Sequence, residues 1–193
     1  MNSRALALPS TAPAKLSITL LSGREGNLSD PTPEVLELLE DLRQGAKSQS
    51  PLDLSQLRLA GLDLSALDLS GTDFSGSDLS GGQLGKMRMM HCKLRGANLA
   101  GADLSGAEFT GADLSDCCLE GVRAEGTGFG MTTMQRVRLF GAEMDHATFS
   151  KSDLSDSDLR CAKLRKARMH EANLTRVDVS QADLTGANLK GLT

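Results

Sequence analysis

The chain has 193 residues, enough for one large domain or a smaller domain with an appendage. It contains no Trp, no Tyr and only five Phe, and apolar residues make up 39%, so Leu, Ala and a few Phe and Met must build a narrow, repeated core. The formal net charge of −4 argues against direct nucleic-acid binding, and no apolar run approaches the roughly 20 residues of a membrane-spanning helix.

Residues 1–50 lack the pattern of the later chain and are interpreted as an N-terminal arm. Its first part, 1–28, is expected to be flexible or a short strand. The first 24 residues hold no acidic side chain, which fits either an export signal or a disordered tail. Four cysteines without metal-type spacing (Cys92, Cys117, Cys118 and Cys161) indicate free thiols, so a cytoplasmic location is expected, with an exported effector as the alternative.

A helix is predicted over 33–44. Thr32 suits its N-cap, Pro33 its first position, and Gly45 a C-terminal stop. The apolar residues on one face of this helix are Val35, Leu38, Leu39 and Leu42. Because an open solenoid exposes its core, this helix is expected to cap the first turn of the following repeat, where Leu replaces the Ala of later units.

Residues 51–193 form a repeat of period five. From Leu54 to Leu189 every fifth residue is apolar, which gives 28 positions, 18 of them Leu. A smaller residue, often Ala, stands two positions earlier, Asp or Asn separates the two 14 times, and Gly follows two positions later 13 times. A period of five excludes a helix and a flat strand. A short extended piece and a turn in each unit predict a square coil of about seven turns, with residues twenty apart stacked. Phe109, Phe129 and Phe149 then stand in one column and are expected to form a ladder of stacked rings in the core.

The units GANLA, GADLS, GAEFT and GADLS, over 96–115, resemble the motif of the pentapeptide repeat proteins, and residues 52–192 follow it nearly throughout. The resemblance implies an all-β solenoid, a right-handed quadrilateral parallel β-helix, to which the predicted N-terminal capping α-helix is added. It says little about function, because one fold serves many roles.

The polar residues do not suggest a catalytic site or a metal site. His91, His146 and His170 fall on outward positions at different heights or faces, so converging metal ligands are not expected. The recurrent Asp residues are interpreted as turn formers, since their side chains bond to nearby backbone groups. The sequence therefore predicts a protein that is not an enzyme, with no catalytic residue, no cofactor and no metal.

Three functions remain open. The first is a bacterial scaffold that binds an unidentified protein partner. The second is a DNA mimic that binds gyrase or topoisomerase, as in the quinolone-resistance branch that the chain resembles; however, its charge is banded along the axis, whereas a duplex is uniformly negative. The third is a secreted effector with a non-catalytic repeat domain.

Two surfaces are candidates for contacts. The repeat degrades between Gly121 and Phe140, and large residues stand at outward positions there and at Met90. The partner-contact candidates are Met90, Met131, Arg136, Arg138 and Phe140. At the other surface, the chain stops within the repeat register, which predicts an end-to-end homodimer through the last coil. The dimer-end candidates are Ala187, Leu189 and Leu192.

Overall fold

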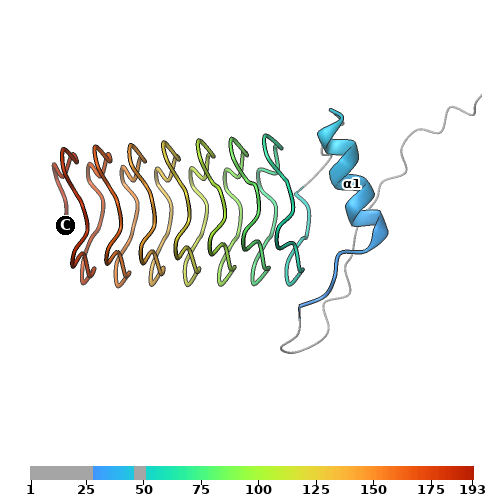
Figure 1. Ribbon diagram of the computed structural model, residues 1–193, viewed down its shortest axis with the longest axis horizontal. Coiled ribbons are helices and arrows are strands. Elements are labelled where there is room, and N and C mark those ends of the chain that lie inside the picture. The colour runs from blue at the N-terminus through green and yellow to red at the C-terminus, as the bar shows by residue number, and fades with distance from the viewer. Residues whose placement is uncertain (1–27, 46–50) are drawn as a thin grey trace, which may run out of the picture.

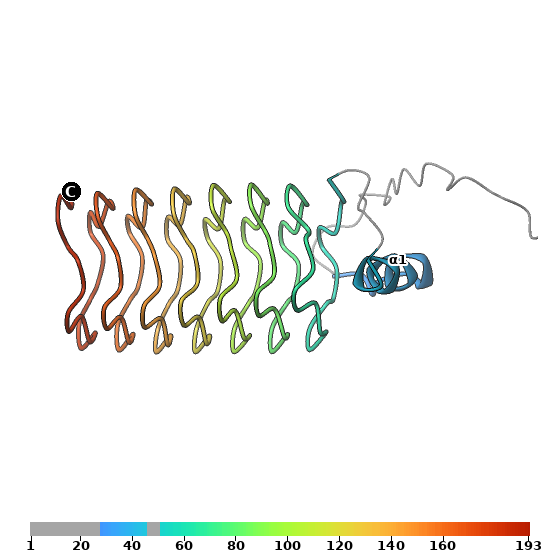
Figure 2. The same cartoon turned by 90° about the horizontal axis from the view of Figure 1, so that it is seen from above.

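The computed structural model describes residues 28–45 and 51–193. In this part of the chain one α-helix, α1 (Pro33–Arg43), precedes a regular coil. Figures 1 and 2 show the coil as a straight rod, with α1 at its N-terminal end and the C-terminus at the other. The expectations for residues 1–27 lie outside the described residues. In the described ranges, no helix has the length and apolar character needed to cross a membrane.

The coil is built by parallel pairing between residues twenty apart, from Asp53 with Asp73 to Arg168 with Asn188. Each turn therefore contains four five-residue units. The backbone N–H of Leu54 donates to the carbonyl of Asp73 at 2.7 Å, and the N–H of Asp73 donates to Leu52 at 2.8 Å. The pairing consists of single bridges rather than continuous strands, because every unit bends after its short extended piece. The result is a β-helical solenoid.

Each bend is made by a residue in the left-handed region, two positions after the central apolar residue. All 28 units have a positive φ there. Glycine occupies 13 of these corner positions, as the sequence suggested, but the other 15 hold residues with a Cβ atom, such as Ala66 (φ 59°) and Met131 (φ 55°). The repeat therefore imposes this conformation whether or not the residue favours it.

The core consists of columns of inward side chains. Apart from the last turn, the central Leu, Met and Phe residues are buried, and so are most of the smaller residues two positions earlier, such as Ala102. The sequence predicted an aromatic ladder in one column, and the structure contains it. Phe129 stacks on Phe109 with ring centroids 5.3 Å apart and on Phe149 at 5.1 Å.

Helix α1 lies against the first turn. Its Val35 and Leu39 are buried in the core cluster, and Arg43 forms an ion pair with Asp63 at 3.7 Å. Thr32 has the extended backbone of an N-cap, but its side chain makes no capping hydrogen bond, in contrast to the expectation from sequence. The arm makes a second contact, because the N–H of Arg58 donates to the carbonyl of Ser29 at 2.8 Å.

Candidate functional site

The interior of the described coil is mostly apolar, with a few buried Ser and Thr side chains. Every buried side-chain nitrogen or oxygen of the described residues has a hydrogen-bond partner. The Cys92 and Cys117 thiols donate to the carbonyls of Leu69 and Leu94, at 3.1 and 2.9 Å. Burial raises the pKa of Cys92 to about 11 and that of Cys117 to about 12. These thiols stay protonated near neutral pH and are poor nucleophiles.

The recurrent Asp and Asn residues serve the backbone. All 14 of them accept a hydrogen bond from the N–H two residues later, as the predicted turn-forming role requires. A typical case is Asp103, which accepts from the Ser105 N–H at 3.0 Å and from its hydroxyl at 2.7 Å. These bonds occupy the carboxylates in shaping the coil.

The histidines do not converge. The His91 ring lies over Gly111, where a Cβ atom would meet Nδ1 at 2.6 Å. His170 Nε2 lies 2.8 Å from a carboxylate oxygen of Glu171. Within residues 28–45 and 51–193, no three His, Cys, Asp or Glu side chains are grouped so that they could hold a metal ion.

The structure separates the two largest partner-contact candidates. Met131 is 62% exposed and Phe140 is 47% exposed. They are nine residues apart in a twenty-residue turn, so they lie near opposite edges of the rod. Met131 and Arg136 occupy successive corners. Met90 is only half-buried and lies two turns before Met131, so the five candidates do not form one patch.

Phe140 instead belongs to a compact surface of its own. The guanidinium carbon of Arg160, one turn further on, lies 5.7 Å from the Phe140 ring centroid. Asp158 holds this guanidinium with two hydrogen bonds, of 2.8 Å and 2.7 Å. On the other side, Arg138 Nε donates to Glu120 at 2.9 Å. We call these residues the Phe140 face: Glu120, Arg138, Phe140, Asp158 and Arg160.

The charged side chains of the Phe140 face hold one another in place through hydrogen bonds. The guanidinium of Arg160 lowers the pKa of Asp158 below its ordinary value, chiefly through their hydrogen bonds. The pKa of Arg138 is raised by hydrogen bonding to Cys118 and then to Glu120. Both arginines remain charged and are held in place beside an exposed aromatic ring. Such fixed Arg and aromatic side chains are common at the centre of protein interfaces.

Three residues of the Phe140 face were not among the contact candidates predicted from the sequence, namely Glu120, Asp158 and Arg160. Arg160 and Glu120 each stand twenty residues from Phe140, so they stack directly above and below it. The twenty-residue offset that predicted the aromatic ladder in the core also applies to outward positions. Applied to Phe140, it would have identified both neighbours.

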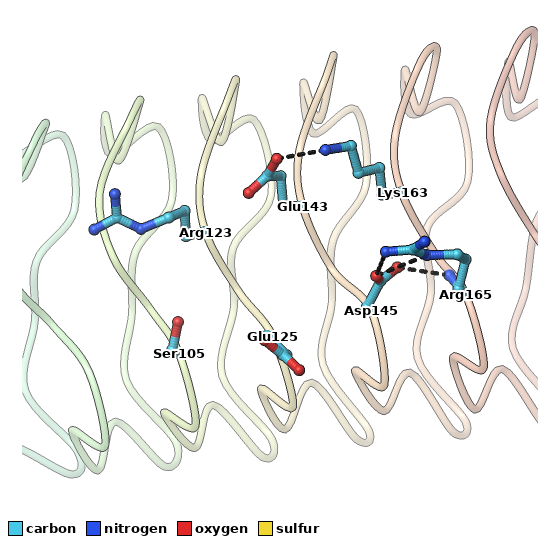
Figure 3. A pocket seen from close by; sticks show the side chains of 7 residues that line it. All are labelled: Ser105, Arg123, Glu125, Glu143, Asp145, Lys163 and Arg165. Carbon is cyan, nitrogen blue, oxygen red and sulfur yellow. Dashed lines mark hydrogen bonds and ion pairs between the residues drawn. The ribbon is translucent and has the colours of Figure 1, made fainter.

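A second surface feature is an open groove of about 220 Å³ along another face (Figure 3). Five of its six charged side chains form an ion pair with a neighbouring turn, Glu125 being the exception among the described residues. Lys163 Nζ donates to Glu143 at 2.6 Å, and Arg165 Nε donates to Asp145 at 2.9 Å. A groove lined by paired charges offers little field to attract a charged ligand.

The dimer-end candidates lie in the last turn. Leu189 is 41% exposed, while Ala187 and Leu192 are partly buried against the core. Val179, which the sequence analysis did not select, is also exposed, at 39%. The end therefore presents apolar side chains to solvent.

The sequence profile described as "Pentapeptide repeats" matches eight copies, over residues 53–85, 88–123, 132–170 and 152–191. Among solved structures, the chain is similar to HetL, a pentapeptide repeat protein involved in heterocyst differentiation regulation in the cyanobacterium Nostoc. Their identity is 21%, covering 82% of this chain and 95% of HetL, with a TM-score of 0.49. A trypsin-treated QnrB1, a plasmid-mediated fluoroquinolone resistance protein, is 23% identical over 75% of this chain and 83% of its own, with a TM-score of 0.48.

A pentapeptide repeat protein from the thylakoid lumen of Arabidopsis thaliana is 31% identical, covering 51% of this chain and 66% of its own, with a TM-score of 0.30. No curated protein matches the chain significantly.

Proposed function

The chain belongs to the pentapeptide repeat family, and from this premise we propose that it is a non-enzymatic scaffold that binds a protein partner through the Phe140 face. The observation that carries the proposal is the exposed Phe140 ring with the guanidinium of Arg160 at 5.7 Å. Burying this ring and its arginines would supply the apolar anchor and the hydrogen bonds that dominate a typical interface.

The surroundings of Phe140 support this role. Residues at the equivalent position on the three earliest turns are Ala60, Ser80 and Ala100, whereas Glu120 and Arg160 flank the ring directly. The large side chains of this column are therefore confined to the turns around Phe140, which makes the Phe140 face a local feature of the rod. Because Asp158 and Glu120 hold the two arginines, little side-chain entropy is lost on binding.

The proposal includes the architecture that presents this face. We propose that α1 caps the N-terminal end, that the coil winds right-handed through about seven turns, and that two copies meet through their C-terminal turns. A right-handed path is the usual one for parallel strands joined by crossovers. The four cysteines are all free thiols, which supports a reducing compartment such as the bacterial cytoplasm.

The test begins with capture of the partner on the immobilised chain from cells of its source organism. The captured protein is then purified separately, and calorimetry measures its affinity for the wild type and for Phe140→Ser. We expect Phe140→Ser to weaken binding by about tenfold or more. Met131→Ser is the matched control, because Met131 is also large and exposed but lies at the opposite edge.

Equal affinities of Phe140→Ser and the wild type would remove the Phe140 face from the proposal. A captured topoisomerase whose supercoiling activity the purified chain inhibits would instead support the DNA-mimic alternative. Measuring both affinity and inhibition therefore separates the two functions.

A further inference from the structure

The register of the coil determines which surface charges are neutralised. Side chains twenty residues apart stack on neighbouring turns, and ion pairs repeatedly follow this spacing, as in Asp73 with Lys93 and Glu143 with Lys163. Twelve of the 16 Lys and Arg residues of the coil form an ion pair.

Four basic residues of the coil have no ion-pair partner among the described residues: Lys86, Lys166, Arg168 and Lys190. Their stacked neighbours explain this. Arg168 bridges Thr148 and Asn188, neither of which is charged. Lys166 stands between His146 and Gly186 in the same register. Three of the four exceptions therefore fall on two adjacent turns near the C-terminal end.

The geometry brings these three residues to one face and its edge. Lys166 is a corner residue (φ 56°) whose Cγ lies 3.4 Å from the Cβ position of Gly186. Arg168 follows two residues later on the adjoining face, and all three side chains are exposed. Lys190 lies one turn above His170, whose Nδ1 is 3.3 Å from the Lys190 carbonyl oxygen. We call Lys166, Arg168 and Lys190 the basic patch.

The acidic groups around the basic patch are engaged elsewhere. Glu171, at the next corner, lies 3.7 Å from Lys151 and 2.8 Å from His170. Asp145 accepts two hydrogen bonds from the Arg165 side chain on the neighbouring face. The patch thus keeps an uncompensated positive charge on a chain whose net charge is −4.

We propose that the basic patch binds a short acidic segment of a protein partner. The proposal rests on the scaffold function above and adds a second contact with a stated chemistry. Lys166 and Arg168 lie on one turn and Lys190 on the next, about 4.8 Å further along the rod, and these three exposed cations match carboxylates spaced along an extended segment. Because the patch has no internal counter-charge, a bound carboxylate replaces no existing ion pair.

An acidic protein segment fits better than a nucleic acid. Tight binding to a duplex takes several phosphate contacts along a continuous basic surface. Here the positive charge is confined to three residues, and the acidic and basic groups alternate over the rest of the rod, as in Asp116 with Arg136.

The test uses a fluorescein-labelled peptide of alternating Glu and Ser, with fluorescence anisotropy measured on the full chain. We expect binding at low ionic strength that weakens as salt approaches about 0.15 M. The double variant Lys166→Gln/Arg168→Gln should lose about tenfold in affinity. Lys93→Gln/Arg95→Gln is the matched control with the same spacing and charge change, but its cations are paired with Asp73 and Asp116. It should bind like the wild type.

Three outcomes would overturn the proposal. The first is an equal loss of peptide affinity in the two double variants. The second is that a peptide of Gln and Ser binds as tightly as the peptide of Glu and Ser, and the third is that a duplex oligonucleotide binds more tightly than either. Circular dichroism on each variant verifies the fold. Phe140→Ser should leave peptide affinity unchanged, so the two proposals fail separately. If the peptide does not bind while a partner still depends on Phe140, only the basic patch is refuted.

Discussion

The corner residue of a five-residue unit carries local backbone strain wherever it has a Cβ atom. A residue with a Cβ atom in the left-handed region loses roughly 1–2 kcal/mol relative to the usual conformation. Fifteen corners hold such residues, and several of them are charged or large. The coil tolerates this cost because the corner N–H groups of every turn but the last donate to the next turn, as the Ala66 N–H does to the carbonyl of Gly85 at 2.9 Å.

Relieving this strain should stabilise the protein. Ala66→Gly removes a single methyl group from an exposed corner with φ 59°. We expect the free energy of unfolding to rise by about 0.5–1 kcal/mol, since relief of strain exceeds the extra freedom of glycine in the unfolded chain. The reverse change, Gly81→Ala, meets no atom within 4 Å and should lower stability by a similar amount. Urea unfolding measures both, and a loss of stability in both variants would show that backbone strain is not decisive.

The turn-forming carboxylates should make the fold sensitive to acid. Hydrogen bonds from the hydroxyls of Ser65 and Ser180 chiefly lower the pKa of Asp63 and Asp178 below 3.8. A carboxyl with a lowered pKa in the folded state stabilises the fold above its unfolded pKa, and loses this effect as pH falls through the folded pKa. Stability should therefore be level above about pH 5 and fall below about pH 4.

Asparagine provides the control for this pH dependence. The oxygen of Asn98 accepts the same bond, from Ala100 N–H at 3.2 Å, without a charge that titrates. Replacing Asp63 and Asp178 with Asn should retain the turns and reduce the loss of the thermal midpoint in acid. If the thermal midpoint of this variant fell in acid as much as that of the wild type, other carboxylates would be the cause of the acid dependence.

At the scale of elements, the aromatic ladder should strengthen the contact between neighbouring turns. Phe129 stacks on two rings, whereas Phe74 is equally buried in another column and forms no ring stack with a described residue. Phe129→Leu should cost about 1–3 kcal/mol more than Phe74→Leu, because each stack contributes roughly 0.5–1.5 kcal/mol beyond burial. Chemical denaturation of the two variants gives this difference. Equal losses would mean that burial alone accounts for the ladder.

The sequence predicted the contacts of buried side chains better than those of exposed side chains. The ladder followed from the twenty-residue spacing of Phe109, Phe129 and Phe149, because a buried side chain has one direction in which to point. Outward residues have more freedom, so the contact between Phe140 and Arg160 depends on rotamers that no periodicity specifies. Thr32 shows the same limit, since its position was foreseen but its missing capping bond was not.

At the scale of the whole molecule, pairing between turns shapes the electrostatic field. Ten of the 19 acidic residues of the coil form an ion pair with a cation of a neighbouring turn, as Asp68 does with Arg88 at 3.7 Å. A mimic of duplex DNA would need a continuous negative surface. The rod instead offers two local features, the Phe140 face and the basic patch, on a largely neutralised background, which favours recognition of a protein at defined places.

The exposed last turn should govern association between copies. The N–H groups of Val179, Leu184 and Leu189 have no backbone acceptor among the described residues, and the side chains of Val179 and Leu189 are exposed. Unpaired strand edges beside apolar side chains tend to be covered by another chain, and a two-fold axis would cover both copies at once.

Sedimentation equilibrium should therefore give about twice the chain mass of 20.4 kDa. Leu189→Asp should shift the protein to monomer, because the dimer would bury an unpaired charge. Met131→Asp, on a side corner, should leave the dimer intact. A wild-type chain that stays monomeric at high micromolar concentration would show that water alone hydrogen-bonds to the unpaired N–H groups of the last turn.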